Sequence, residues 1–217
     1  MKIVIVGGVA GGASCATRAR RLGEEAEIVV FERGDHVSFA NCGLPYYIGG
    51  TIQERNRLLV ATAESLRRRF NLDIRTRSEV VSVDREAHEV TVQTRDGETY
   101  RESYDKLVLA PGAEPVRPPI EGIDHPRIFT LRNVRDTDRI KEVVDSGAQR
   151  ALVVGAGYIG VEMAENLRDR GMDVTLIELL DQVMPIFDAE MAELVQEELE
   201  KHGVRIEVSY RDELPPL

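Results

Sequence analysis

The sequence is poor in cysteine, with only Cys15 and Cys42 among its 217 residues. Their separation matches neither a disulfide framework nor the paired spacing of a zinc site, so we expect no disulfide-bonded fold and no bound metal. Each cysteine is therefore expected to be either a packing residue or a reactive thiol.

Long apolar runs are also lacking, and none approaches the roughly 20 residues needed to cross a bilayer. The chain opens with a short β-branched run at residues 2–6 that leads directly into a glycine-rich loop. No signal-peptide cleavage pattern is visible there. We therefore expect a cytoplasmic protein without a membrane partner.

Basic residues are fewer than acidic ones. Lysine and arginine number 28 against 38 acidic residues, which gives a formal net charge of −10. Such a balance argues against nucleic acid and anionic membranes as partners. The partner that we expect is a small-molecule substrate. Hydrophobic residues make up 42% of the chain, enough for one large domain or two small ones.

One supersecondary pattern is present twice. A β-branched strand leads into a glycine-rich loop and a helix, and a second strand follows that ends on a glutamate. This pattern predicts an α/β fold with two Rossmann-like, three-layer dinucleotide-binding units. The first copy comprises residues 2–6, a helix opening near Gly11, and residues 28–31 ending on Glu32; the second comprises residues 151–154, a helix to about Gly171, and residues 174–177 ending on Glu178.

The region between the two copies contains further elements. Residues 64–70 have a helical pattern, and strand-like runs at 79–84, 88–94 and 106–110 suggest an inserted antiparallel piece. Prolines 111, 115, 118 and 119 then mark a boundary, because no helix continues through them. We expect a first domain over residues 1–115 and a second over residues 116–217.

The loop of the second copy fits the dinucleotide fingerprint G-x-G-x-x-G. Its first glycine permits a tight turn, its second lets the backbone approach a pyrophosphate, and its third lets helix pack on strand. Glu178 suits a ribose 2′-OH and repels a 2′-phosphate, which favours NADH over NADPH. The predicted contacts are Gly155, Gly157, Tyr158, Ile159, Gly160 and Glu178.

The loop of the first copy is less regular, because Val9 stands where the middle glycine is expected. Its position after the first strand and before a helix, with Glu32 beyond, still indicates a dinucleotide site. The simplest assignment of the two cofactors places FAD at this loop and NADH at the second loop. The predicted contacts here are Gly7, Gly8, Val9, Ala10, Gly11, Gly12, Glu32 and Arg33.

Residues 38–50, Ser-Phe-Ala-Asn-Cys-Gly-Leu-Pro-Tyr-Tyr-Ile-Gly-Gly, form an irregular mixture of apolar and polar residues. Together with the opening loop and the run at residues 104–113, this segment resembles the coenzyme A-disulfide reductase family. That family belongs to the single-cysteine flavoprotein reductases, alongside NADH oxidases, NADH peroxidases and persulfide reductases. The resemblance extends from Met1 to about residue 208.

The resemblance implies a role for several residues. Cys42 would lie beside the flavin and alternate between a thiolate and a mixed disulfide with coenzyme A. Ala110 and Gly112 would approach the flavin by their backbone. Coenzyme A would contact Ser14, Arg18, Arg21, Ser38 and Asn41, although the first three, spaced i, i+4 and i+7, also suit a solvated basic helix face.

The resemblance also implies a chain about twice this length, in which further segments complete the FAD domain and form a homodimer. We therefore expect both domains to be incomplete and the chain to be truncated. The leading hypothesis is a reductase of coenzyme A disulfides or persulfides. Two alternatives remain: an NADH oxidase or peroxidase using a Cys42 sulfenate, which the pairing of Asn41 with Cys42 disfavours, and a non-catalytic nucleotide-binding fragment.

Overall fold

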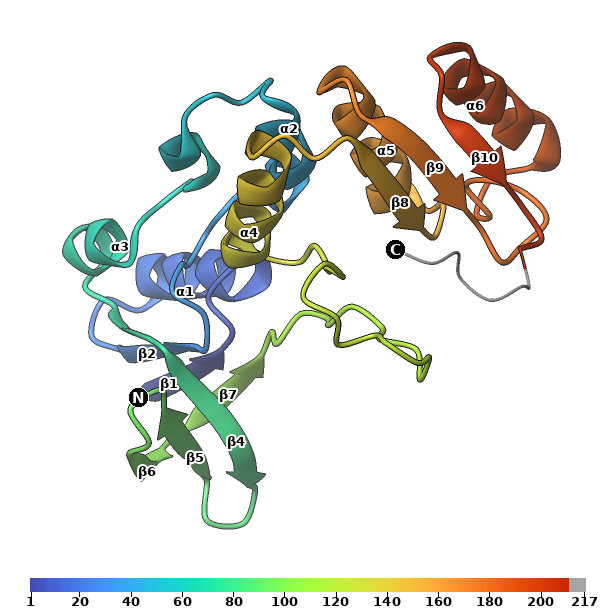
Figure 1. Cartoon of the computed structure of the whole chain (residues 1–217). Helices are drawn as coiled ribbons and strands as arrows, with labels where there is room; N and C mark the ends of the chain where they lie inside the picture. Colours follow the sequence, from blue (N-terminus) through green and yellow to red (C-terminus); the bar gives the residue numbers. More distant parts are fainter. Residues whose placement is uncertain (211–217) are drawn as a thin grey trace. The chain divides into compact units, whose positions relative to one another are not determined.

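The computed structural model describes residues 1–210, and the chain divides into two compact units (Figure 1). The first unit comprises residues 1–40 and 56–116, and the second comprises residues 41–55 and the chain from residue 117 onward. The segment 41–55 therefore groups with the second unit, which the expected division into residues 1–115 and 116–217 did not anticipate. Among the described residues, no helix is both long enough and apolar enough to cross a bilayer.

The first unit is built on a parallel sheet with the strand order β3-β2-β1-β7. A separate antiparallel sheet has the order β4-β5-β6. The elements are β1 (Lys2–Val6), α1 (Ala10–Leu22), β2 (Glu27–Glu32), η2 (Arg55–Leu58, at the return from the segment 41–55), α3 (Ala63–Phe70), β3 (Asp73–Thr76), β4 (Ser78–Asp84), β5 (Glu89–Thr94), β6 (Thr99–Ser103) and β7 (Lys106–Leu109).

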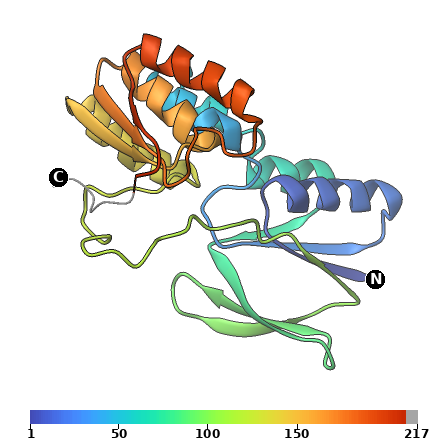
Figure 2. The same cartoon turned by 90° about the vertical axis from the view of Figure 1, so that its right-hand side faces the viewer.

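Both faces of this parallel sheet are covered, which gives the unit three layers (Figure 2). Alternate residues such as Ile5 and Val30 pack toward α1 and α3, whereas Val4 and Phe31 pack against Val92 of the antiparallel sheet. Because side chains of a strand alternate between faces, β1 and β2 must be apolar at nearly every position. Their continuous β-branched runs are therefore the sequence signature of this double burial.

The antiparallel piece differs from the expected one in its third strand. Residues 106–110 were expected to belong to it, but that prediction is wrong: β7 pairs in parallel with β1, with Val6 opposite Leu109. The third antiparallel strand is β6, which follows the Asp96-Gly97 turn. The apolar run of β7 fits a parallel strand, because Val108 packs on the helix side and Leu107 on the other.

The second unit contains a parallel sheet with the order β10-β9-β8. Its core includes Leu176 of β9, Leu167 of α5, Leu199 of α6 and the fully buried Ile48. The elements are η1 (Asn41–Gly43), α2 (Leu44–Gly49), α4 (Val134–Asp145), β8 (Arg150–Val154), α5 (Tyr158–Asp169), β9 (Asp173–Ile177), α6 (Ala189–Lys201) and β10 (Arg205–Glu207).

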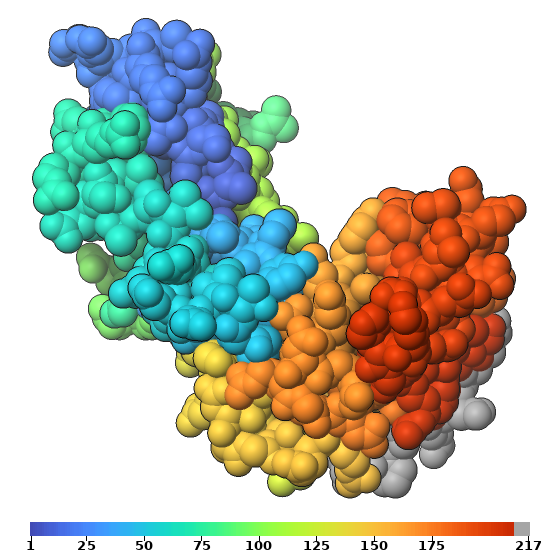
Figure 3. Space-filling model, turned by 90° about the horizontal axis from the view of Figure 1, so that it is seen from above, coloured from blue at the N-terminus to red at the C-terminus, as the bar shows by residue number. Residues whose placement is uncertain are grey.

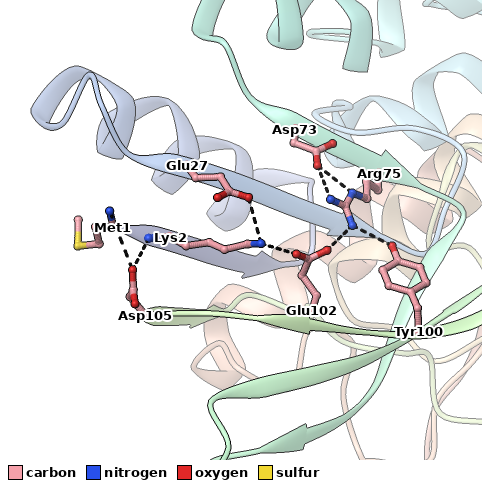
Figure 4. Close-up of polar contacts among 8 residues, drawn as sticks. All are labelled: Met1, Lys2, Glu27, Asp73, Arg75, Tyr100, Glu102 and Asp105. Carbon is pink, nitrogen blue, oxygen red and sulfur yellow. Dashed lines mark hydrogen bonds and ion pairs between the residues drawn. The ribbon is translucent and has the colours of Figure 1, made fainter.

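An ionic network joins the two sheets of the first unit (Figure 4). The Glu102 carboxylate on β6 accepts hydrogen bonds from Lys2 of β1 and from Arg75 of β3. Arg75 also binds Asp73 at 2.6 Å and the Tyr100 hydroxyl at 3.1 Å. Burial raises the pKa of Glu102, but the bonds from Lys2 and Arg75 outweigh it, and the pKa lies below its ordinary value.

Glu102→Gln should therefore destabilise the first unit by about 1–2 kcal/mol near neutral pH, because it removes the charge that pairs two cations. A lowered folded pKa stabilises the protein above the ordinary glutamate pKa, and this contribution is lost as the pH falls toward the folded value. Thermal unfolding at several pH values should show the two proteins converging in acid. Glu98→Gln, in an exposed turn, is the matched control; an equal loss in both variants would contradict the prediction.

Candidate active site

The first glycine-rich loop joins β1 to α1 through contacts that leave no room for a side chain at three of its glycines. Gly7 has φ of +96°, and a Cβ on it would lie 2.0 Å from the Ala110 carbonyl oxygen. A Cβ on Gly12 would lie 1.6 Å from the Gly7 carbonyl oxygen. Gly8 is similarly enclosed, because its Cβ would lie 2.7 Å from a methyl group of Val37. The predicted cofactor residues Gly7, Gly12 and Ala110 thus lie together in the first unit.

The second loop repeats this geometry in the second unit. Gly155 also has φ of +96°, and a Cβ on Gly160 would lie 1.8 Å from its carbonyl oxygen. Each loop is anchored to its second strand by the first glycine, whose N–H donates at 2.8 Å to Phe31 in one unit and to Ile177 in the other. The loops therefore correspond position by position.

The correspondence explains the irregular residue of the first loop. Val9 and Gly157 occupy the same place, as the N-cap residues of α1 and α5. A Cβ on Gly157 would meet no atom within 4 Å, so the packing of the protein does not require glycine there. Open space at the N-terminus of a twelve-residue helix is where a phosphate would be favoured.

The two predicted ribose acids make matching hydrogen bonds. The Glu32 carboxylate accepts from the N–H of Gly8 at 2.8 Å and of Gly34 at 2.7 Å. The Glu178 carboxylate accepts from Ala156 at 2.7 Å and from Leu180 at 3.0 Å. Each oxygen thus receives one N–H and keeps further acceptor capacity for a hydroxyl. These bonds fix the orientation of each carboxylate beside its loop.

The remaining predicted cofactor residues lie around the same two loops. Arg33 forms an ion pair with Glu114 and lies 3.9 Å from Glu79. Tyr158 is exposed and its ring meets Phe187 edge-on at 6.0 Å. The others are Ala10 and Gly11 at the start of α1, Gly112 with φ of +73°, and the exposed Ile159 in the first turn of α5.

The cysteine segment, residues 41–55, begins with two short helical elements. Asn41 and Cys42 lie in η1, with the Cys42 thiol exposed, and residues 44–49 form the helix α2. The negative charge of Glu162, reinforced by burial, by Glu165 and by Cys42, raises the pKa of Tyr46 on this helix. The helix over residues 44–49 was not predicted from the sequence.

Contacts with α4 and α5 hold the cysteine segment in the second unit, and Figure 3 shows it in light blue and cyan against their gold and orange atoms. Ile48 is fully buried in the core, and a Cβ on Gly49 would lie 2.1 Å from Oδ1 of the buried Asn166. Asn166 was not predicted as a partner of this segment. The Gly49-Gly50 pair was the available signal, since paired glycines often mark close backbone approach.

The predicted substrate residues fall in two places. Ser14, Arg18 and Arg21 are exposed on α1 of the first unit, and the Arg21 guanidinium lies 5.7 Å from the centre of the Phe70 ring. Ser38, also in the first unit, has φ of +49°, and its N–H donates to Gly8 at 3.1 Å. Such a backbone conformation in a non-glycine residue is strained and is often found at functional sites. Asn41 belongs to the second unit.

A comparison with protein families finds a match that includes both glycine-rich loops. The model of the family described as pyridine nucleotide-disulphide oxidoreductase matches residues 1–211. The chain belongs to this family.

Individual members of the family are similar to the chain over nearly its whole length. A coenzyme A disulfide reductase of Staphylococcus haemolyticus is 43% identical over 205 residues, which cover 94% of this chain and 46% of that protein. The structure of reduced CoADR-RHD from Bacillus anthracis is 56% identical, with a TM-score of 0.93, over 96% of this chain and 38% of that one.

A NAD-dependent persulfide reductase from A. fulgidus is also similar, with 38% identity and a TM-score of 0.92 over 96% of this chain and 40% of that one. The α/β fold with two Rossmann-like units is thus confirmed. The chain spans about half the length of the curated relatives it matches.

Gly49→Ala tests how closely α2 lies on α5 in this member of the family. The new methyl group would overlap Asn166, so the variant should lose about 1–3 kcal/mol of stability, measured by urea unfolding. Replacing Asn166 by alanine in the same chain removes the closest atom and should recover part of the loss. Gly23→Ala is the control, because its Cβ meets nothing nearer than 3.7 Å; a similar loss there would refute the explanation.

Proposed function

We propose that this oxidoreductase chain binds FAD at the first loop and NADH at the second, and that Cys42 receives the electrons for a disulfide or persulfide substrate. The observation that carries the proposal is the repeated loop-and-acid geometry, one copy in each compact unit, together with an exposed thiol on an ordered helical segment. The relatives named coenzyme A disulfide reductase and persulfide reductase support the choice of a sulfur acceptor.

The residues present fit a dinucleotide in each unit. In the second loop Gly157 leaves the approach of a pyrophosphate free of a side chain, whereas Val9 carries one at the same place in the first loop. Helices of 13 and 12 residues begin beside the two loops. Glu32 and Glu178 are fixed by backbone hydrogen bonds and retain acceptor capacity for ribose hydroxyls. Bound together, the two cofactors would supply an electron pair from NADH.

The preference for NADH follows from the surroundings of Glu178. Its carboxylate would accept a hydrogen bond from a ribose 2′-OH and repel a 2′-phosphate. The next two residues, Leu179 and Leu180, are exposed and apolar, so neither offers a cation to a 2′-phosphate. The name of the persulfide reductase, which describes it as NAD-dependent, is consistent with this preference.

Cys42 would carry the sulfur chemistry. Its thiolate attacks one sulfur of a disulfide, which forms a mixed disulfide and releases the other half as a thiolate. An electron pair originating from NADH then breaks the mixed disulfide, and protonation releases the second thiol. In sum, one disulfide, one NADH and one proton yield two thiols and NAD⁺. Coenzyme A is the proposed carrier of these sulfurs, and the second sulfur must come from the substrate because Cys15 is half-buried beside the core of the first unit.

The variants Glu32→Ala and Glu178→Ala form a matched pair that tests the assignment of cofactors. Glu32→Ala should lower the flavin content of the purified protein and leave NADH affinity unchanged, because only the first unit is altered. Glu178→Ala should keep its flavin, bind NADH about tenfold more weakly, and discriminate less against NADPH. Flavin absorbance and nucleotide titration measure both effects. Unchanged flavin content in Glu32→Ala would refute the assignment of FAD to the first loop.

Cys42→Ser tests the chemistry in the flavin-loaded protein. It should abolish reduction of coenzyme A disulfide but leave bleaching of the flavin by NADH intact, since hydride transfer needs no thiol. Cys15→Ser is the control and should retain disulfide reduction. Retained activity in Cys42→Ser would make Cys42 a packing residue. Turnover with oxygen or peroxide, and none with disulfides, would favour an oxidase or peroxidase, and a chain without flavin would favour a nucleotide-binding fragment.

A further inference from the structure

Arg170 connects the cysteine segment to two other helices of the second unit. It is the C-cap residue of α5, and one guanidinium nitrogen donates to the Ile48 carbonyl at 3.0 Å. A second nitrogen donates to Asp145, the last residue of α4, at 2.7 Å. The Ile48 carbonyl lies in the last turn of α2, where no further helical turn supplies a donor. Arg170 therefore provides a donor at the end of the helix that begins beside Cys42.

The partner of Arg170 is itself held in place. Lys141 lies 3.3 Å from the Asp145 carboxylate, and its ammonium lies 5.1 Å from the centre of the Tyr47 ring on α2. The hydrogen bond from Arg170, assisted by Lys141, lowers the pKa of Asp145, so this carboxylate remains charged. Two cations from different helices thus meet at one anion, and both also contact α2.

The far end of the segment has a separate attachment. The Arg55 guanidinium binds Asp138 of α4 through two parallel hydrogen bonds of 2.8 and 2.7 Å. Paired bonds of this kind fix orientation as well as distance. The segment 41–55 is consequently attached at its end by Arg55, at its middle by Ile48 and Gly49, and at the end of α2 by Arg170.

We propose that Arg170 is a positioning residue for Cys42, which holds α2 on the second unit so that the Cys42 sulfur presents a fixed direction of attack. The proposal rests on the proposed function, in which Cys42 exchanges with a disulfide. Such exchange requires the attacking sulfur to be aligned with the bond that it breaks, so its rate depends on orientation as well as on thiolate content. A small alkylating reagent makes no comparable demand, because it approaches an exposed thiol from many directions.

The test compares two reagents on a chain in which Cys15→Ala leaves Cys42 as the only thiol. Arg170→Met should slow formation of the mixed disulfide with coenzyme A disulfide by about tenfold, as followed by mass spectrometry. Alkylation by iodoacetamide should stay within about twofold. Hydrogen exchange of the Gly50 and Ile52 amides, which both donate to the Tyr46 carbonyl, should accelerate by about tenfold.

Two further variants separate positioning from general stability. Arg170→Lys should recover part of the exchange rate, because one ammonium can serve either Ile48 or Asp145 but lacks the guanidinium fork. Arg205→Met removes an arginine of the same unit that contacts Thr175 and should change none of the rates. The proposal would be overturned by an unchanged disulfide-exchange rate in Arg170→Met, or by equal slowing of disulfide exchange and alkylation in that variant. It would also be overturned if Arg205→Met slowed disulfide exchange as much as Arg170→Met does.

Neither flavin nor NADH is needed for these measurements, so their outcome does not depend on the assignment of the two cofactors. If the parent chain exchanged no faster with coenzyme A disulfide than with oxidised glutathione, coenzyme A would be the wrong substrate. The ratio of the Arg170→Met rate to the parent rate, measured with oxidised glutathione, would still decide the role of Arg170.

Discussion

The close approach of helix to loop is the constraint on which each unit depends. In both units the chain must turn from a strand into a helix so sharply that the last loop glycine touches the carbonyl of the first. A side chain at Gly12 or Gly160 would push the helix off the sheet, and the Cβ distances of 1.6 and 1.8 Å leave no rotamer that avoids this. The same turn directs backbone N–H groups toward the acid at the end of the next strand.

This constraint made much of the fold predictable from the sequence. Local geometry dictates glycine at Gly7, Gly12, Gly155 and Gly160. Burial on both faces dictates the continuous apolar strands β1 and β2 of the first unit. Both signals depend on near neighbours in the sequence. The strand-loop-helix-strand copies and their terminal acids could therefore be located without any knowledge of long-range packing, and the family model matches the same region.

Other features depend on partners far away in the sequence, and these were predicted wrongly or missed. The run at residues 106–110 is apolar in either kind of sheet, so only its pairing with β1 identifies it as parallel. The helix α2 is short and begins with Leu44-Pro45, so its local pattern is weak. It is held by tertiary contacts from Arg170 and Asn166, more than 100 residues later in the chain.

The cysteine segment shares a compact unit with the second glycine-rich loop. The chain passes between the units at residues 40/41, 55/56 and 116/117, so Cys42 and that loop lie in the same unit. Helix α5 begins at that loop and carries Asn166 near its end, with Arg170 as its C-cap. This one helix, roughly 18 Å long, therefore links the second loop to the contacts with α2. Ser38, in contrast, belongs to the first unit and is attached to the first loop, because its N–H donates to the Gly8 carbonyl. Only three residues separate Ser38 from Cys42, and the joint between the units lies among them.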